Sequence, residues 1–313
     1  MSNGISIVIV TYNSENYIFD CLVALKDASV PFEVIIIDNA SLDSSIDIAR
    51  AAMPQATIVA NTDNVGFAKA VNAGVKLAAH DYFMLLNPDC RLLGAGLDEL
   101  VRTLDVDRGV GIVAPAIEHP NGRLEVRSAG FQPKLPAMLV HSAGLARFPL
   151  TARHVRGFHL YPAGESGTDT EVEWVSGACF AVRRSTWENV GGLSEKWFMY
   201  AEDIQLCNRV RLAGESILHT SRAKATHVVG ASSETVDGPV WTLWIENLAD
   251  YYKTEFRPKP VTMLLWKAAT SSIYFSRAAV YTLRSLIDQP HRGQWRREST
   301  KFIAYAQAVM RFG

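Results

Sequence analysis

Short apolar runs alternate with helix-like stretches along the first ninety residues of the chain. The runs show no polar alternation, which is typical of strands covered by helices on both faces. Four β-α units of this kind predict a parallel, doubly wound sheet of the α/β class. The expected strands are residues 5–10, 32–37, 57–60 and 82–86, and the expected helices run through Leu25, over 44–52 and through Ala79.

The rest of the chain is first irregular and then helical. Six prolines are spread over residues 108–173, where we expect long loops and a hairpin around Asn121-Gly122. A second ordered block covers residues 172–230, and the last eighty residues are mainly helical. We therefore expect an α/β domain at 1–230, with halves at 1–105 and 106–230, followed by a helical region at 231–313.

The candidate helix at residues 261–287 is apolar on one side and basic on the other. Three cations interrupt it, so it is too charged to span a membrane. One interpretation packs this helix on the protein's own core. Another lays it on a membrane surface, with aromatic side chains near the headgroups and arginines attracted to anionic lipid. The three cations are Lys267, Arg277 and Arg284, the aromatic residues are Trp266, Tyr274, Tyr281 and Trp295, and the arginines are Arg292, Arg296 and Arg297.

Composition narrows the classes of protein. Of the 313 residues, 48% are hydrophobic and 20% charged, which excludes disordered and collagen-like chains. The formal net charge of -1 argues against a chain-wide attraction to nucleic acid. Four cysteines lie far apart without a C-x-x-C pair, which excludes a zinc ribbon and a disulfide scaffold and favours a reducing, cytoplasmic compartment. The N-terminus lacks the features of a signal peptide.

Two common nucleotide-binding loops are absent from the sequence. No G-x-G-x-x-G follows the first apolar run and no G-x-x-x-x-G-K-[ST] occurs, which disfavours a nicotinamide-binding Rossmann protein and a P-loop NTPase. Polar clusters nevertheless follow the expected strands directly, at residues 11–14, 38–41 and 87–89. In open α/β sheets, ligands bind beyond the carboxyl ends of the strands. The position of these clusters therefore predicts a ligand site at that edge.

Each polar cluster also has a structural explanation. Asp38 could accept a hydrogen bond from a base or a ribose, or it could close a turn. The Asn64-x-Gly66 segment and Lys69 could bind phosphates, or the glycine could simply form a turn that enters a helix. Asn87-Pro88-Asp89 could hold a divalent cation that bridges a diphosphate, or form a turn.

Two further segments carry titratable groups: the Glu202-Asp203 pair and His227. Glu202 and Asp203 follow an aromatic apolar stretch, and one of them could act as a general base. A helix start enriched in acids explains the same pair. His227 could bind a metal, although a lone histidine is more often structural.

Taken together, these segments resemble the family-2 inverting glycosyltransferases of GT-A fold over residues 5 to about 230. No single segment is decisive, but the ordered set is specific. The resemblance is nearest to the rhamnosyltransferase-like branch of bacterial cell-surface polysaccharide enzymes. The matching segments are Val10-Thr11-Tyr12-Asn13, Asp38-Asn39-x-Ser41, Asn64-x-Gly66-Phe67 with Asn72 and Gly74, Leu86-Asn87-Pro88-Asp89, Trp174-x-Ser176-Gly177-Ala178-Cys179, Gly191-Gly192-Leu193, Phe198-Met199-Tyr200-x-Glu202-Asp203, and His227.

The resemblance implies a role for each candidate residue. Asp203 would be the catalytic base, and Asp89 and His227 would hold a divalent cation, Mn or Mg. Asn87 departs from relatives with two acids in this motif, so only one carboxylate there can bind metal. The residues expected to bind the donor are Thr11, Asn13, Asp38, Asn64, Gly66, Lys69 and Asn87, and those expected to contact or support the acceptor are Trp174 and Glu202.

The resemblance also implies the partners. The donor would be a nucleotide-diphosphate sugar, and the acceptor a saccharide or a polyprenyl-linked saccharide, with no nucleic acid involved. The C-terminal helices would contact the cytoplasmic face of the membrane or pair two copies of the chain. Two other functions remain open on the residues alone: a sugar-phosphate nucleotidyltransferase, which should have a basic loop after the first strand, and a non-catalytic sugar-nucleotide-binding module.

Overall fold

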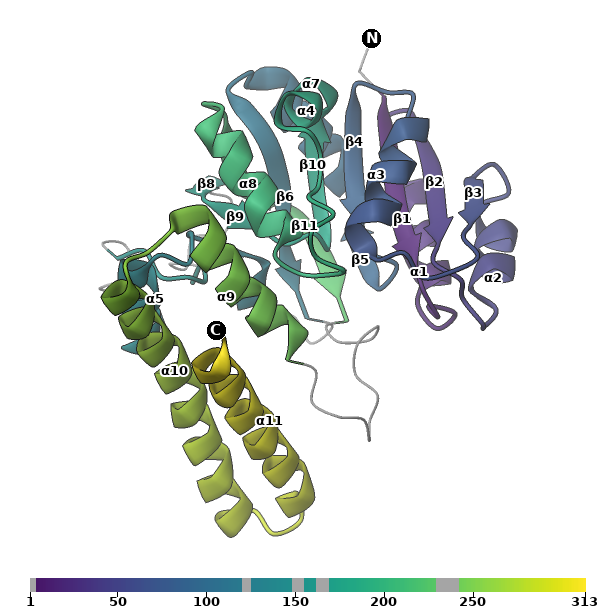
Figure 1. The fold of residues 1–313 in the computed structure, drawn as a ribbon. Coiled ribbons are helices and arrows are strands. Elements are labelled where there is room, and N and C mark those ends of the chain that lie inside the picture. Colours follow the sequence, from purple (N-terminus) through teal and green to yellow (C-terminus); the bar gives the residue numbers. More distant parts are fainter. Residues whose placement is uncertain (1–3, 120–124, 148–154, 162–168, 229–241) are drawn as a thin grey trace. The chain divides into compact units, whose positions relative to one another are not determined.

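The computed structural model describes residues 4–119, 125–147, 155–161, 169–228 and 242–313 (Figure 1). The chain divides into two compact units. The sheet unit comprises Met1–Gly130 and Gly164–Glu234, and the helical unit comprises Phe131–Ala163 and Thr235–Gly313. Residues 131–163, from the middle of the chain, thus belong with the C-terminal helices, which the sequence pattern does not indicate.

One large sheet organises the sheet unit. Its strands follow the order β3-β2-β1-β4-β10-β6-β11-β5, and β8 pairs with β11. A separate two-stranded sheet joins β7 to β9. The strands are β1 (Ile5–Thr11), β2 (Phe32–Asp38), β3 (Thr57–Ala60), β4 (Tyr82–Leu86), β5 (Cys90–Leu93), β6 (Val110–Glu118), β7 (Ala129–Gly130), β8 (Asp169–Val172), β9 (Trp174–Val175), β10 (Cys179–Arg183) and β11 (Ser216–His227).

The strand directions bring several strand ends to one edge of the sheet. Strands β3, β2, β1 and β4 are parallel, as the sequence predicts. Strand β10 is antiparallel to both β4 and β6, and β11 is parallel to β6. Consequently β1, β2, β4, β6 and β11 all end at the edge where β10 begins. The sheet is therefore mixed, with a parallel first half.

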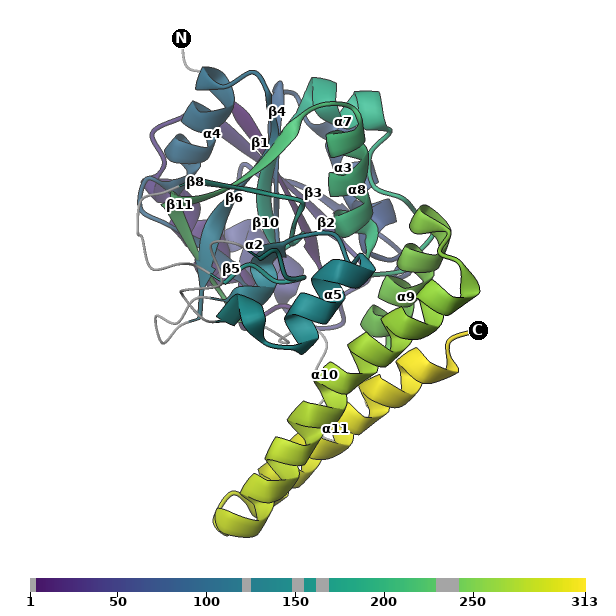
Figure 2. The ribbon, with the colours of Figure 1, turned by 90° about the vertical axis from the view of Figure 1, so that its left-hand side faces the viewer.

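Helices cover both faces of this sheet. Figure 2 shows α4 on one side of the sheet and α3, α7 and α8 on the other. Alternate residues of a strand serve the two faces: Ile36 packs into the cluster that contains α1, α2 and α4, whereas Ile35 and Ile37 pack with Ala70 of α3. The helices of the sheet unit are α1 (Ile18–Ala24), the short 3-10 helix η1 (Leu25–Asp27), α2 (Ser45–Ala52), α3 (Phe67–Leu77), α4 (Gly96–Val106), η2 (Val126–Ser128), α7 (Arg184–Val190) and α8 (Glu202–Leu212).

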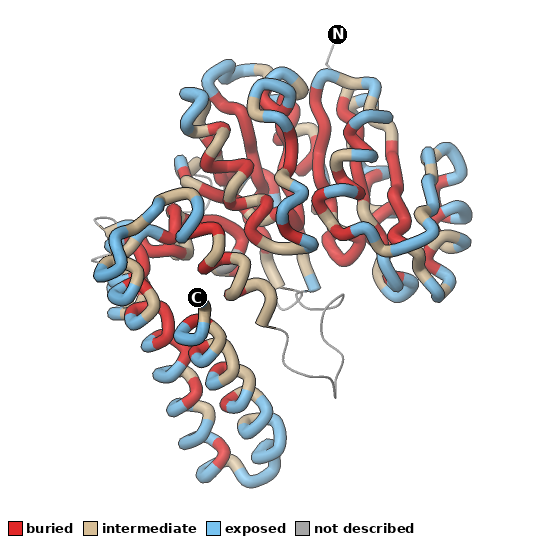
Figure 3. Tube along the Cα trace, viewed as in Figure 1, coloured by how far each residue is buried: buried red, intermediate tan, exposed pale blue. Residues whose placement is uncertain are grey.

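The core lies along β1, β2, β4, β6 and β10, which are buried for most of their length (Figure 3), whereas β3 at one edge of the sheet has no buried residue. All four cysteines are buried and none forms a disulfide, in agreement with the sequence prediction. Helix α7 ends at Gly191, whose positive φ of 81° suits a left-handed helix terminus. Burial on both faces thus explains the apolar runs of β1, β2 and β4, but not the run of β3, which is a largely exposed edge strand.

Strand β6 corrects the expectation that residues 108–173 form mainly loops. Its nine residues lie between β10 and β11. Pro115 is tolerated because β6 pairs with β10 only around Ile112 and Val113, and because β11 has a register shift after Thr220, the partner of Pro115. The hairpin expected at Asn121-Gly122 lies outside the described residues.

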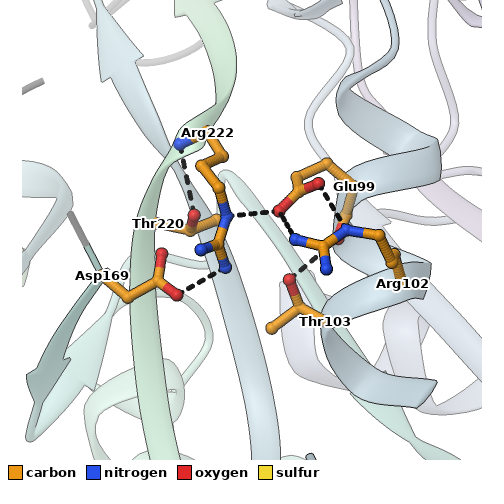
Figure 4. A network of polar contacts seen from close by, with 6 residues as sticks. All are labelled: Glu99, Arg102, Thr103, Asp169, Thr220 and Arg222. Carbon is orange, nitrogen blue, oxygen red and sulfur yellow. Dashed lines mark hydrogen bonds and ion pairs between the residues drawn. The ribbon is translucent and has the colours of Figure 1, made fainter. Parts of the chain in front are cut away.

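An ion-pair network holds α4 and β8 to β11 at this register shift (Figure 4). The Arg222 guanidinium donates to Glu99 of α4 and to Asp169 of β8, each at 2.5 Å. Glu99 also accepts two hydrogen bonds from Arg102. These bonds, with the one from Arg102 foremost, lower the pKa of Glu99. The irregular part of β11 is therefore bonded to α4 through Glu99 and to β8 through Asp169.

The helical unit is built around stacked aromatic side chains. The Trp266 ring stacks on Tyr252 with centroids 4.8 Å apart, and its indole N–H donates to the Pro133 carbonyl at 2.6 Å. Tyr281 stacks on Phe302 between the last two helices. Its elements are α5 (Leu135–Ser142), the 3-10 helix η3 (Leu145–Arg147), α9 (Leu243–Phe256), α10 (Pro260–Ile287) and α11 (Arg292–Arg311).

These contacts settle where the C-terminal aromatic residues lie. Trp266 and Tyr274 are buried, and Tyr281 and Trp295 stack on each other. The headgroup position that the membrane interpretation gave to Trp266 and Tyr274 is therefore wrong, because both side chains are buried inside the helical unit. Tyr281 and Trp295 are half-buried, and their position at the headgroups stays a prediction. Among the described residues, no helix has the length and apolar character needed to cross a membrane.

We expect Gly74→Ala to destabilise the sheet unit by about 1–3 kcal/mol, since overpacking costs this much in a dense core. A Cβ at this position of α3 would lie 2.6 Å from Val8 Cγ1 and 3.2 Å from Ile37 Cγ1. Denaturant unfolding measures the change. Gly293→Ala on α11 is the control, because no atom lies within 4 Å of its Cβ position. Equal stability of Gly74→Ala and wild type would contradict the close packing of α3 on the sheet.

Candidate active site

The ends of β1 and β2 lie side by side at the ligand edge. Thr11 and Asp38 are register partners, and Asn39 N–H donates to the Thr11 carbonyl at 2.8 Å. Thr11 is fully buried, and its Oγ1 has no hydrogen-bond partner in the described part of the chain. The Asp38 carboxylate accepts hydrogen bonds from the Ser41 backbone N–H and hydroxyl, at 2.9 and 2.5 Å. Asp38 thus closes a turn, one of the two roles its sequence context allowed.

The loops after these two strands are bonded to each other. Asn13 has a positive φ of 49°, and its N–H donates to Ser41 Oγ at 2.9 Å. Its side-chain Oδ1 accepts from the Leu42 N–H at 2.8 Å. These bonds join residues almost thirty positions apart, so the Asn13 side chain links the loops after β1 and β2.

The segment from Asn64 to Phe67 forms the next wall of the site. Asn64 Oδ1 accepts from the Gly66 N–H at 3.1 Å, which closes a local turn. Gly66 has a φ of 89°, and a Cβ there would lie 2.7 Å from the Phe198 carbonyl oxygen. The Phe67 N–H donates to that same oxygen at 2.9 Å. Only glycine permits this approach, so the turn is bound directly to the segment that leads into Asp203.

Lys69 lies on the first turn of α3 and is exposed. No acidic side chain in the described ranges forms an ion pair with it, so its ammonium is available for an anion. Asn72, one turn further, binds elsewhere: its side chain accepts from the Leu193 N–H and donates to the Leu193 carbonyl, at 3.1 and 2.9 Å. Asn72 therefore holds the loop after α7.

The Asn87-Pro88-Asp89 turn brings a carboxylate to His227. Asn87 N–H donates to the Ala178 carbonyl at 2.8 Å, and Val228 N–H donates to the Asp89 carbonyl at 3.1 Å. Asp89 is 6% exposed, and its Oδ1 lies 3.2 Å from His227 Nε2 without accepting a hydrogen bond. A buried carboxylate oxygen that faces an imidazole nitrogen without a bond fits a shared cation.

This donor set is small. Within the ranges that the structure describes, no group of three or more His, Cys, Asp or Glu side chains could hold a metal ion. Mn²⁺ and Mg²⁺ often take only one or two ligands from the protein when phosphates supply others. Asp89 and His227 therefore fit a cation that also binds a diphosphate.

Asp203 is held by backbone hydrogen bonds at the start of α8. Its Oδ2 accepts from the Gly177 N–H at 2.9 Å, and its Oδ1 accepts from the Ile204 N–H at 2.8 Å. Burial raises the pKa of Asp203 above its ordinary value, and the two N–H donors oppose the rise. The Phe67 ring packs 3.3 Å from the Cβ position of Gly177. The orientation of Asp203 therefore depends on the same Phe67 that is bonded to Phe198.

Glu202 is more deeply buried than its neighbour. It is 3% exposed, and its Oε2 has no hydrogen-bond partner among the described residues. Burial raises the pKa of Glu202 to about 8, and the charge of Asp203 adds to the rise, while the backbone N–H groups of Glu202 and Tyr200 lower it. Tyr200 and Ala201 both have positive φ, 71° and 76°, a strained conformation that is common at functional sites.

The structure brings the candidate residues to one edge and connects them through few bonds. Trp174, by contrast, is 4% exposed in β9 and pairs with Gly130.

Sequence reasoning missed Asn61, whose Nδ2 donates to Asn39 Oδ1 at 2.9 Å, while Asn39 Nδ2 donates to the Gly66 carbonyl. The signal was available, because Asn61 follows β3 directly, as the other polar clusters follow their strands.

Comparison with known proteins points to one family. The chain matches the family described as Glycosyl transferase family 2 over residues 6–186. The N-acetylglucosaminyl-diphospho-decaprenol L-rhamnosyltransferase of Mycobacterium tuberculosis (strain H37Rv) is 28% identical over 242 residues, 72% of this chain and 76% of that protein. Rhamnosyltransferase WbbL of Escherichia coli (strain K12) is 26% identical over 235 residues, 71% of this chain and 82% of that protein.

A solved structure is similar in fold. The mannosyltransferase PcManGT from Pyrobaculum calidifontis, in complex with GDP-Man and Mn²⁺, superimposes with a TM-score of 0.60. The match covers 98% of this chain and 85% of the mannosyltransferase, at 17% sequence identity. At that identity, the likeness establishes the fold alone.

We expect Glu202→Gln to change how stability depends on pH. Between the ordinary value of 4.5 and the raised value of about 8, folded Glu202 keeps a proton that the unfolded chain releases. Stability is therefore lost as pH rises through this window. The glutamine variant has no such proton, so wild type should lose at least about 1 kcal/mol relative to it between pH 5 and 8.

Denaturant unfolding at several pH values measures this difference. Glu188→Gln, at an exposed position of α7, is the matched control and should follow wild type. A constant difference between wild type and Glu202→Gln across the window would show that Glu202 is ionised in the folded protein.

Proposed function

Since the chain belongs to glycosyl transferase family 2, we propose that it transfers a sugar from a nucleoside diphosphate to an acceptor hydroxyl with inversion at the anomeric carbon. Its fold is GT-A, and its relatives place it in the rhamnosyltransferase-like branch, which acts in cell-surface polysaccharide synthesis. Membership of this family argues against the sugar-phosphate nucleotidyltransferase that the residues alone left open.

The observation that carries the mechanism is the position of Asp203 at Gly177, against which the Phe67 ring also packs. Its carboxylate is oriented by the Gly177 N–H, beside Phe67 and the Gly66 turn. We assign Asp203 as the general base. It accepts the proton of the acceptor hydroxyl while that oxygen forms a bond to the anomeric carbon. The bond to the nucleoside diphosphate breaks on the opposite face, which inverts the configuration.

The leaving diphosphate needs positive charge and N–H donors nearby. Asp89 and His227 would hold a divalent cation, which when bound would neutralise the negative charge that develops on the diphosphate. The free ammonium of Lys69 is a second source of positive charge, on the first turn of α3. Thr11, whose buried hydroxyl lacks a partner, would donate to or accept from the nucleoside, next to Asn13 and Asp38.

The substrate classes are proposed from the relatives. The name of the Mycobacterium tuberculosis relative specifies L-rhamnose and a decaprenyl-diphosphate-linked acceptor. We propose the same classes here: a deoxyhexose donor and a polyprenyl-linked saccharide acceptor, used at the cytoplasmic face of the membrane. The raised pKa of Asp203 suits a base that must hold a proton during transfer.

Asp203→Asn should abolish transfer and preserve donor binding. The amide keeps the shape of the carboxylate but has no useful basicity, and general bases contribute about 10²–10⁴-fold to rate. Release of nucleoside diphosphate from a panel of nucleotide sugars, together with donor binding by calorimetry, measures both properties. Asp27→Asn, an exposed position in η1, is the control. More than about a tenth of the wild-type kcat in Asp203→Asn would rule out this assignment.

Activity should require a divalent cation, with Mn²⁺ at least as effective as Mg²⁺, because an imidazole ligand suits manganese better. EDTA should remove activity and added Mn²⁺ restore it. His227→Ala should raise the Mn²⁺ concentration needed for half-maximal rate, whereas His291→Ala, an exposed position before α11, should not. Full activity in excess EDTA contradicts the cation requirement. An unchanged Mn²⁺ response in His227→Ala removes only the histidine from the site.

A further inference from the structure

The exposed face of α10 carries almost no charge along its whole length. The helix has 28 residues, which corresponds to about 42 Å. Large apolar side chains stand open on this face: Leu264 is 60% exposed, Leu283 58% and Ile287 83%. The exposed residues of α10 other than Arg284 are Pro260, Val261, Leu264, Leu265, Ala268, Ser272, Phe275, Ser276, Ala279, Val280, Thr282, Leu283, Leu286 and Ile287.

The cations of α10 contact aromatic rings and the chain end of the hairpin; Lys267 and Arg277 are half-buried there, whereas Arg284 is exposed. Lys267 Nζ donates to the Phe312 carbonyl. The Arg277 guanidinium lies over the Phe302 ring, and Arg284 lies over Tyr281 and Trp295, with 5.3 Å between its guanidinium and the Trp295 centroid. The basic side of the helix thus contacts aromatic rings of the hairpin, and the apolar side has no packing partner within the part of the chain that the structure describes. This is the reverse of an ordinary surface helix, which turns its charges outward.

Charge indicates what covers this face. Residues 260–313 contain eight Lys and Arg against two Asp and Glu, a net charge of +6. The remaining 259 residues contain 23 against 30, a net charge of -7. The chain is therefore nearly neutral only because two strongly charged parts cancel. The basic part coincides with the hairpin that bears the apolar face.

At the turn of the α10–α11 hairpin, exposed apolar side chains and exposed arginines lie close together along the chain. Leu283, Leu286 and Ile287 are exposed in the last turns of α10. Residues 288–291 then lead into α11, whose first two turns expose Arg292, Arg296 and Arg297. An apolar strip with arginines beside it matches an anionic lipid surface, where acyl chains accept the strip and phosphates attract the guanidinium groups.

We propose that the exposed face of α10 docks this protein on an anionic lipid bilayer, with the helix lying in the interface. A second copy of the chain would also cover the apolar strip. That arrangement brings two hairpins of charge +6 together, so repulsion opposes it, whereas anionic lipid neutralises the same charge. The proposal rests on the proposed function only in that a lipid-linked acceptor would give the docking its purpose.

Vesicle binding by the full-length protein tests the proposal without any sugar nucleotide present. Wild type should co-sediment with phosphatidylcholine vesicles containing phosphatidylglycerol at low salt, and dissociate at high salt. Leu264→Glu combined with Leu283→Glu should lower the partition coefficient about tenfold or more, because each substitution puts a charge where burial is needed. Leu212→Glu, on the 78%-exposed last residue of α8, is the matched control and should bind like wild type.

A second variant tests the electrostatic part. Arg292→Gln, Arg296→Gln and Arg297→Gln together should lower binding about 100-fold and flatten its salt dependence, since each cation near an anionic surface contributes about fivefold. All substituted positions are exposed, so the variants should fold, and thermal unfolding of each variant is the measurement that checks this.

Three outcomes overturn the docking proposal. One is wild-type protein that ignores anionic vesicles at low salt. Another is a Leu264/Leu283 variant that binds as well as wild type. The third is a dimer by analytical ultracentrifugation that this variant dissociates while no vesicle binding occurs, which assigns the face to a second copy. Failure of the proposed transferase function is seen separately, as absence of nucleoside diphosphate release with a soluble acceptor.

Discussion

The close approach of Gly66 to Phe198 is the contact on which the candidate active site depends. One carbonyl oxygen, that of Phe198, accepts the Phe67 N–H and leaves no room for a Cβ at position 66. Phe67 in turn packs against Gly177, whose N–H orients Asp203. Loops separated by more than a hundred residues are thereby held in one arrangement. The contact between Gly66, Phe67 and Phe198 is made by backbone atoms, and the Phe67 ring extends it to Gly177.

The same edge of the sheet collects buried charge that the fold must compensate. Asp203 is compensated by two backbone N–H donors, whereas Glu202 lacks a partner for one oxygen and takes up a proton instead. Asp89 faces His227 without a hydrogen bond. Unpaired buried groups cost stability, and they persist here beside two residues in strained conformations. Such a concentration of unpaired groups and strain is more typical of functional sites than of structural cores, which supports the proposed site.

The helical unit is stabilised by aromatic side chains and leaves one apolar side of α10 exposed. Its aromatic residues give it an interior of its own, with Trp266 fully buried and Tyr281 stacked between α10 and α11. The two arginines of α10 lie over rings of α11, Arg277 over Phe302 and Arg284 over Trp295. An apolar strip then remains outside. The helical unit therefore has a buried interior like the sheet unit, and the exposed apolar strip is confined to one side of α10.

The sequence alone determined the parallel half of the sheet and the edge at which the polar clusters gather. Apolar runs specify strands covered on both faces, and the polar residue after each run specifies where a ligand can bind. It also indicated Asp89, His227 and Asp203 through spacing shared with a known family. It did not reveal that β6 is an interior strand, because Pro115 argues locally against one and only the register of β10 and β11 makes it acceptable.

Only the tertiary structure decided which side of α10 faces water. The helical period separates the basic side from the apolar side, but it cannot say which of them another helix covers. Phe302 and Trp295 of α11 hold Arg277 and Arg284 on the α11 side through cation–π contacts, and the apolar side is exposed as a result. The bond from Phe67 to Phe198 was equally hidden, because a hydrogen bond between backbone atoms leaves no trace in residue identity. Local patterns therefore fixed the elements, while long-range contacts between residues far apart in the chain fixed what each element presents.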